Sequence, residues 1–301
     1  MISVLLRLHS DRLLKMMKSI YKILFFVLAG LTTSTAVRAD YHEQMKFLIY
    51  SPRYFGPSGF PIPELRDGNA GRRIEAEIRG EYHYYRGDKT QDIFARLRIP
   101  IVKGRAGIEV SWVFWEKYKT TEETKKERFA VDTHSPIKYH GDIVFSSFFQ
   151  VLKSEKWVDA TLSATIKTAS GGRACDARFT DAAAYWFDVT VGRNLWKRAD
   201  GQASIRMQAL AGFYCWMTND IVNRQNDAVL YGVGIAGTYR NFKLTTDFSG
   251  IHGYKNNGDR PIHWRSNLTY EIKKNIISFR YTHGIKDRLY DSYGLAYIRC
   301  F

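Results

Sequence analysis

Long runs of strictly alternating apolar and polar residues dominate the chain from residue 73 to its end. In 157–168, the apolar side chains from Val158 to Ile166 fall on one face and the polar ones from Asp159 to Lys167 on the other. Residues 74–84 and 262–273 repeat this period of two. Because successive side chains of a β-strand point to opposite sides of a sheet, each run separates an apolar environment from a polar one. The pattern predicts an all-β protein.

The number and length of these runs narrow the fold class. We expect twelve strands, at 73–86, 91–101, 107–117, 139–152, 156–168, 180–194, 202–217, 228–240, 242–252, 261–273, 276–286 and 290–301. Most reach the roughly 9–11 residues that a tilted strand needs to cross a bilayer, whereas strands of soluble proteins have about 5–6. Aromatic residues make up 15% of the sequence and prolines number only 7, which favours strands.

The connections between the runs alternate in length. Those at 102–106, 153–155, 195–201, 241 and 274–275 are short, whereas 118–138, 169–179, 218–227 and 253–260 are longer. Two of the second set, 87–90 and 287–289, are also short, so the asymmetry holds on average. Transmembrane barrels combine short periplasmic turns with longer outer loops. We therefore predict an antiparallel up-and-down transmembrane β-barrel of about twelve strands. The alternative is a secreted soluble β-sandwich or a large lipocalin-like barrel, which alternation by itself allows.

Residues 1–39 have the features of a secretory signal peptide. Basic residues precede the apolar run Ile23–Gly30, and small residues stand at positions −3 and −1 before a cleavage site that we place after Ala39. The run is far shorter than the about 20 apolar residues of a membrane-spanning helix. Because the signal is complete from Met16 or Met17, we expect one of these to be the true start. The formal net charge of +15 would fall to +10 after cleavage.

The last run supplies a resemblance. It places Tyr293, Leu295, Tyr297 and Phe301 on one face and ends the chain on an aromatic residue. This resembles the C-terminal assembly signal of bacterial outer-membrane β-barrel proteins, although Arg299 stands where that signal has an apolar residue. The resemblance implies the outer membrane of a Gram-negative bacterium, with its lipid, and insertion by the barrel assembly machinery. It concerns the architecture of residues 73–301 and identifies no particular member. The basic residues Lys125, Lys126 and Arg128 of loop 118–138 are expected either to contact anionic lipopolysaccharide or to be solvated.

Residues 40–72 differ from the rest of the chain. They hold four of the seven prolines, between Pro52 and Pro63, and therefore cannot form a central strand. The segment is either a periplasmic tether or a plug inside the barrel. Because tethers are usually polar and this one carries Tyr54, Phe55 and Phe60, we favour a packed plug.

The polar faces of the strands are rich in charge. We expect these side chains to line the lumen: Glu75, Glu77, Arg79, Glu81, Arg96, Arg98, Glu109, Asp142, Asp159, Lys167, Arg206, Lys243, Asp247, Arg265, Glu271, Lys273 and Arg280. Small barrels are filled by side chains, whereas 16–18 strands leave an open channel, and twelve lies between. A polar path and a closed interior of ion pairs therefore both remain open. Excess Arg and Lys in a path would favour anions.

Three cysteines are too few for a disulfide scaffold and form no metal-type CxxC pair. Cys175 and Cys215 are expected at the same outer rim, in an oxidising compartment, so we predict a disulfide between them. Cys300 is expected at the opposite end, without a partner.

Signatures of catalysis are thin. A lipid hydrolase of the outer membrane would need a Ser/His pair on the barrel surface near the membrane boundary. Three pairs are close in sequence: His263 with Ser266, Ser249 with His252, and His134 with Ser135. None is a nucleophile elbow, and regular strands would point the members of the first two pairs to opposite faces. We nominate no catalytic residue, no cofactor and no metal.

The function favoured by these patterns is passive passage of small polar or anionic solutes. A phospholipase or lipid A deacylase is one alternative. A closed structural or surface-binding barrel, whose loop 118–138 meets a partner, is another. Basic proteins often bind nucleic acid, but an exported barrel is not expected to do so.

Overall fold

The computed structural model describes residues 55–128, 130, 135–172, 182–218, 225–254, 256 and 258–301. The predicted signal peptide, residues 40–54, Cys175 and His134 lie outside these ranges.

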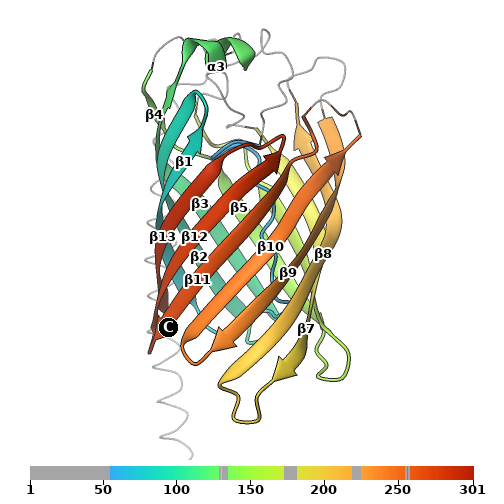
Figure 1. The fold of residues 1–301 in the computed structure, drawn as a ribbon. Helices are drawn as coiled ribbons and strands as arrows, with labels where there is room; N and C mark the ends of the chain where they lie inside the picture. Colours follow the sequence, from blue (N-terminus) through green and yellow to red (C-terminus); the bar gives the residue numbers. More distant parts are fainter. Residues whose placement is uncertain are drawn as a thin grey trace, which may run out of the picture. The chain divides into compact units, whose positions relative to one another are not determined.

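The described chain forms strands almost throughout (Figure 1). A short helix, α3 (Glu122–Glu127), interrupts them in the longest connection. No helix in the described ranges is long and apolar enough to span a bilayer. The strands are β1 (Glu75–Tyr85), β2 (Asp88–Val102), β3 (Ala106–Thr120), β4 (Ile137–Tyr139), β5 (Ile143–Leu152), β6 (Asp159–Lys167), β7 (Ala184–Lys197), β8 (Ala203–Met217), β9 (Gln225–Tyr239), β10 (Phe242–Gly253), β11 (Ile262–Ile272), β12 (Asn275–Lys286) and β13 (Asp291–Cys300).

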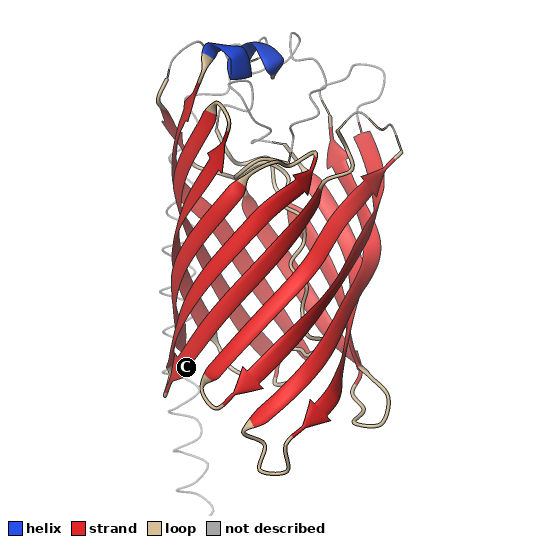
Figure 2. Cartoon of the chain, viewed as in Figure 1, coloured by secondary structure: helices blue, strands red, loops and turns tan. Residues whose placement is uncertain are grey.

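Twelve of these strands close into one antiparallel barrel (Figure 2). Each pairs with its neighbours in sequence, and β1 pairs with both β2 and β13, which closes the sheet. β4 is a short additional strand that, among the described residues, pairs with the end of β3 alone. The predicted all-β antiparallel barrel and each of its twelve strands are therefore confirmed. The predicted strand 139–152 begins later than expected, at Ile143, after the break at Gly141 and Asp142.

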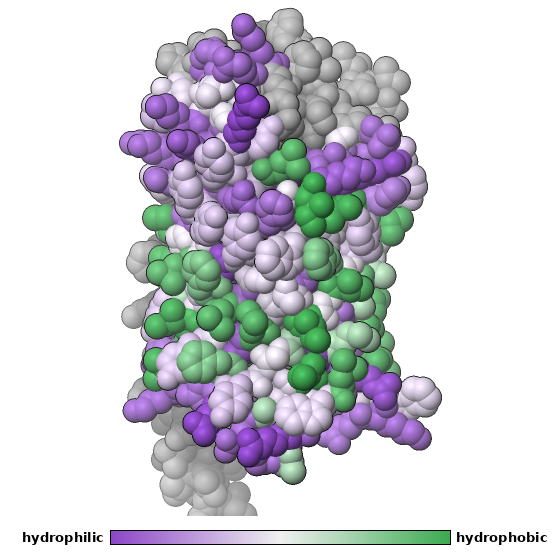
Figure 3. All heavy atoms as spheres, in the orientation of Figure 1, coloured by the Kyte–Doolittle hydropathy of each residue, from purple (hydrophilic) through white to green (hydrophobic). Residues whose placement is uncertain are grey.

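Apolar side chains cover the outside of the barrel. Figure 3 shows hydrophobic residues gathered around its middle, with hydrophilic residues toward both ends. Many inner positions are polar instead: on β6, Thr161, Ser163, Thr165 and Lys167 are all buried. This is the reverse of a soluble barrel, which buries its apolar face, and it is the arrangement found in transmembrane barrels.

Two ends of the barrel can be told apart by their connections. The turns at 103–105, 198–202, 240–241 and 273–274 make up the short-turn end. The connection that carries α3 lies at the other end, which we call the long-loop end. Residues 55–72, which precede β1, run between these two ends inside the barrel.

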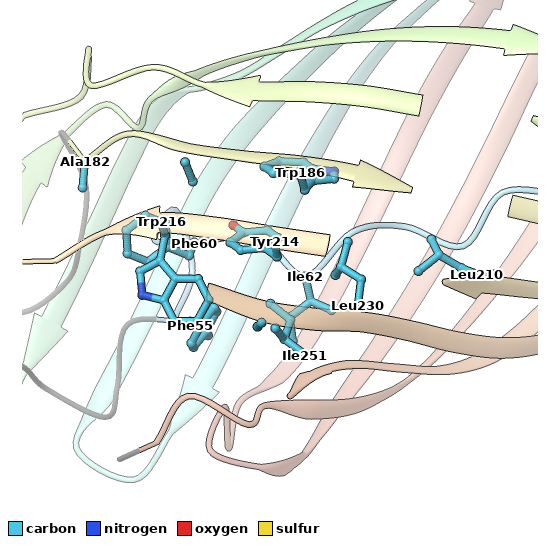
Figure 4. Packing of buried hydrophobic residues seen from close by; sticks show 12 residues of the cluster. Phe55, Phe60, Ile62, Ala182, Trp186, Leu210, Tyr214, Trp216, Leu230 and Ile251 are labelled. Atoms are coloured by element: carbon cyan, nitrogen blue, oxygen red, sulfur yellow. The ribbon is translucent and has the colours of Figure 1, made fainter. Parts of the chain in front are cut away.

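We call residues 55–72 the inner segment, and they form neither helix nor strand. Phe55, Phe60 and Ile62 are buried against inward-facing residues of β7 to β10 (Figure 4). The rings of Phe55 and Trp216 meet edge to face, with centroids 5.3 Å apart. The main apolar cluster of the protein therefore lies between the inner segment and one half of the wall. It also includes Ala182, Ala184, Trp186, Leu210, Tyr214, Ala228, Leu230 and Ile251.

The inner segment comes closest to the wall near the short-turn end. A Cβ atom on Gly192 of β7 would lie 2.2 Å from the backbone oxygen of Asp67. Gly68 has a φ of +75°, in the left-handed region. Both positions therefore require glycine, one for close approach and one for its backbone conformation. The backbone N–H of Gly104 donates to the carbonyl of Gly71 at 3.2 Å, which fastens the segment to the first short turn.

Candidate functional site

The lumen is the candidate site, and its charged half begins on β1 and β2. Arg79 Nη1 lies 2.8 Å from Glu77 Oε1, and its Nε lies 3.1 Å from Glu81 Oε1. Arg96, opposite Glu77 in the register of β1 and β2, forms an ion pair with it. Glu77, Arg79 and Arg96 therefore each have a partner of opposite sign along or across these strands, as burial of charge requires.

The charge pairing continues on the next strand, β3. Glu109 of β3 accepts a hydrogen bond from Arg98 Nε at 3.1 Å. Arg66 of the inner segment donates to the other oxygen of Glu109, at 3.2 Å. The guanidinium of Arg66 also lies over the ring of Phe148, 4.2 Å from its centroid. The inner segment thus adds to the charge pairing of the wall, because Glu109 binds Arg66 of the segment as well as Arg98 and, at 3.9 Å, Arg96 of the wall.

Glu64 of the inner segment also pairs with charged residues of the wall, here as the acid that binds two arginines. One of its oxygens accepts from Arg96 Nη1 at 3.1 Å, and the other binds Arg280 of β12. The inner segment is therefore amphipathic: Phe60 and Ile62 pack on the apolar half of the wall, while Glu64 and Arg66 pair with its charged half.

A third group of polar residues lies on β10 and β11. Arg265 binds Asp247 through two nitrogens, at 3.1 and 3.0 Å. Ser249 Oγ lies 2.9 Å from both Asp247 Oδ1 and His263 Nε2. Two charged pairs mark the ends of the lumen: Lys167 with Asp142 next to Phe60, and Arg206 with Asp159 near Asp67.

A cavity of about 240 Å³ lies on the charged side of the inner segment. Its walls come from the inner segment, from inward positions of β1 to β3, β5 to β7 and β11 to β13, and from Asp142 and Arg288 in the connections. Seven Arg or Lys side chains line it against six Asp or Glu side chains. At about 30 Å³ of liquid per water molecule, this is room for about eight waters or one small solute.

The structure places the predicted lumen residues as follows. Those on the strands, from Glu75 to Arg280, occupy inward positions, and Asp142 is buried just before β5. Lys243 and Glu271 lie at the short-turn end with side chains 40% and 41% exposed, paired with Asp67 and Arg73. Lys273 is different, because it lies in the turn after β11, with a φ of +56°, and is exposed. Its position one residue beyond the strand explains why alternation misplaced it.

Several lumen residues were missed. Glu64 and Arg66 come from a segment without alternation, so no periodic signal marks them. Asp92 and His83 were detectable, because they share faces with Arg96 and Glu81 respectively. Asp188 on β7 likewise occupies an inward position and is buried.

The serine and histidine residues pair differently from their order in sequence. Ser249 and His263 are opposite each other on β10 and β11, and both are buried in the lumen. Asp247 contacts Ser249 and not His263, so the relay of a Ser–His–Asp triad, in which the acid orients the histidine, is not formed. No described Ser/His pair among those considered lies on the apolar outer face, where a lipid hydrolase would need it.

The remaining predicted positions lie on the outer face or at the ends. Tyr293, Leu295, Tyr297 and Phe301 all point outward from β13 and the chain end and are exposed. Cys215 is buried near the long-loop end of β8. Since Cys175 lies outside the described ranges, its disulfide with Cys215 stays a prediction. Cys300 is buried at the short-turn end, without a disulfide to any described residue.

Solved structures provide the comparison with known proteins. The sequence matches no family model and no curated protein. The COG4313 outer membrane channel from Pseudomonas putida F1 superimposes with a TM-score of 0.54 at 11% identity, covering 79% of this chain and 100% of that one. The β-domain of the Bordetella autotransporter BrkA has a TM-score of 0.47 at 11% identity, and the match covers 77% of this chain and 100% of that one. The KdgM porin has a TM-score of 0.43 at 11% identity, and the match covers 75% of this chain and 99% of that one. Together with the closed twelve-strand sheet, the first of these likenesses shows that the chain has the fold of an outer-membrane β-barrel protein.

Proposed function

We propose that the protein is a channel of the outer membrane that passes small polar solutes, with a slight preference for anions. The proposal rests on the cavity on the charged side of the inner segment, which is lined by seven basic and six acidic side chains. Charged walls replace the hydration of a passing ion, and their sign sets its selectivity. Since the excess is one positive charge, the preference for anions is modest.

The inner segment restricts this path. It fills the apolar half of the lumen with Phe55, Phe60 and Ile62 and crosses to the charged half with Glu64 and Arg66. Without the inner segment, the lumen of the twelve-strand barrel would enclose a larger volume than the 240 Å³ cavity. The segment therefore acts as a plug that leaves a narrow, charged passage.

The location belongs to the same proposal. The exposed aromatic face of β13, with its terminal Phe301, supports insertion by the barrel assembly machinery. The apolar outer band supports contact with membrane lipid, and the long-loop end would then face lipopolysaccharide. Residues 1–39 would direct export of the chain from a Gram-negative cytoplasm and be removed.

Conductance of the folded protein in a planar bilayer, measured under a salt gradient, tests the proposal. We expect small discrete steps with a reversal potential on the anion side. Arg280→Gln removes one positive charge from the cavity and should shift the reversal potential toward cations. Arg299→Gln removes the same charge from the end of β13, away from the cavity, and should leave the potential unchanged. A folded protein that stays silent, both intact and with Glu64→Gln, would overturn the channel.

A further inference from the structure

We propose that the lumen binds one divalent transition-metal ion between β1 and β2. Glu81 and His83 of β1 and Asp92 of β2 each offer one ligand atom, and these atoms all lie within 4.8 Å of one another. All three residues line the cavity, so a cation that enters the lumen reaches them. Among the described residues, no other His, Cys, Asp and Glu side chains are grouped in this way.

The strand register brings two like charges together at this point. Glu81 and Asp92 are direct cross-strand partners. Carboxylates placed opposite each other on adjacent strands repel, which destabilises the pair. A cation bound between them would convert this repulsion into attraction.

Asp92 gives the second, independent observation. Its side chain is buried, with the residue 4% exposed, and its Oδ2 lies 2.8 Å from His83 Nε2. Its other oxygen, Oδ1, is buried without a hydrogen-bond partner in the described chain. Buried carboxylate oxygens are rarely left so, because each has lost its contact with water. A metal ion would satisfy it.

His83 is oriented as metal-binding histidines usually are. Its Nδ1 lies 2.7 Å from Ser292 Oγ, on the strand paired to the other side of β1. A hydrogen bond from the distal nitrogen fixes the ring and its tautomer and leaves the second nitrogen for the metal. The metal would take the place of the proton shared between Nε2 and Asp92.

The neighbouring arginine does not block the site. Arg79 contacts Oε1 of Glu81 at 3.1 Å and Oε1 of Glu77 at 2.8 Å, so its charge is shared by two acids. A metal bound through Oε2 of Glu81 would leave this ion pair in place. One imidazole and two carboxylates form a donor set suited to Zn²⁺, and three protein ligands leave a position open toward the cavity.

Zinc binding to the folded protein in detergent tests this site. Equilibrium dialysis with Zn²⁺ should give one ion per chain at saturation. His83→Gln and Asp92→Asn, each close in size to the native residue, should each abolish that binding. Ser292→Ala leaves the ligands but removes the orienting hydrogen bond, and should weaken the affinity by about 10–100-fold.

The chain offers a matched control. His283 Nδ1 lies 2.7 Å from Asp291, but this pair is on the outer surface and half exposed. His283→Gln should therefore bind zinc like the native protein. Heat-modifiable migration on gels shows whether each variant has a folded barrel. Absence of zinc from the native protein, or unchanged binding by both folded variants His83→Gln and Asp92→Asn, would overturn the proposal.

Discussion

Glu64 and Arg280 form an ion pair although 216 positions separate them in the sequence. Glu64 belongs to the inner segment and Arg280 to β12, so their contact joins the plug to the wall. The second oxygen of Glu64 binds Arg96 on β2, and a single carboxylate therefore holds two strands on the charged side. Glu64 therefore ties the plug to two strands of the charged half of the wall.

Removing the charge of Glu64 should loosen the plug. In Glu64→Gln, two arginines lose a charged acceptor, and such hydrogen bonds contribute about 1.5–3 kcal/mol each. Because the Glu64 side chain is 33% exposed, we expect the lower end of this range. Single-channel recording should show larger or more frequent open steps than in the native protein.

Asp200→Asn is the matched control, since it removes an acidic charge whose partner Arg198 is largely exposed in a short turn. It should leave both conductance and thermal stability unchanged. Equal conductance in Glu64→Gln and the native protein would show that this ion pair does not hold the plug.

The apolar contacts of the plug should dominate its attachment. Phe60 has no exposed surface, and it packs against Phe55 and Trp216 with centroids 6.1 and 6.2 Å away. Truncation of a buried phenylalanine to alanine costs about 3–5 kcal/mol. Since Phe60 lies on the inner segment and not on a strand, Phe60→Ala should detach the segment and leave the barrel closed.

Limited trypsin digestion of the folded protein measures this detachment. Cleavage at Arg66 or Arg72 should be faster in Phe60→Ala than in the native protein, while the barrel fragment resists. Phe279→Ala provides the comparison, because Phe279 faces outward from β12 and is 49% exposed. Equal cleavage of the two variants would contradict a packed plug.

Alternation predicted the wall of this protein well because successive side chains of each strand face alternately the outside and the lumen. A one-residue error would have turned an entire strand inside out, so the pattern is strongly constrained. It failed where the backbone leaves the strand, as at Lys273, and where the chain has no period, as at Glu64.

The pairing of lumen residues on adjacent strands could not be predicted from the sequence, for another reason. Sequence neighbours such as Ser249 and His252 attract attention, but a sheet brings together residues opposite each other on adjacent strands. The partner of Ser249 is His263 because the register of β10 and β11 places them together. The alternation within one strand does not determine how that strand is aligned with its neighbour.

The long connection after β3 should depend on one buried ion pair. Arg128, at the end of α3, donates to Asp88 Oδ2 and to the hydroxyl of Tyr290, both at 2.6 Å. The exposed fractions of Arg128 and Asp88 are 3% and 0%. Breaking a buried pair from one side costs about 3–5 kcal/mol, because the other charge stays buried. Asp88→Asn should therefore release α3 from the rim of the barrel.

Hydrogen exchange of the backbone amides detects this release. Protection of the α3 amides should fall in Asp88→Asn, while that of the central strand residues stays unchanged. Lys126→Ala, at an exposed position of the same helix, should change stability by less than about 0.5 kcal/mol. Unchanged protection of α3 in Asp88→Asn would refute the role of this pair.

The depth of a residue in the membrane should set the cost of placing a charge on the outer face. Phe248 and Phe242 both point outward from β10, at 53% and 50% exposed, but Phe248 lies near the middle of the strand and Phe242 at its short-turn end. An arginine on the lipid face costs about 2–4 kcal/mol at the bilayer midplane and about 0–1 kcal/mol near the interface. Phe248→Arg should therefore lower the free energy of unfolding in lipid vesicles far more than Phe242→Arg. Since the two substitutions are chemically identical and share a strand and a face, equal losses would mean that the apolar band of Figure 3 does not lie in a bilayer.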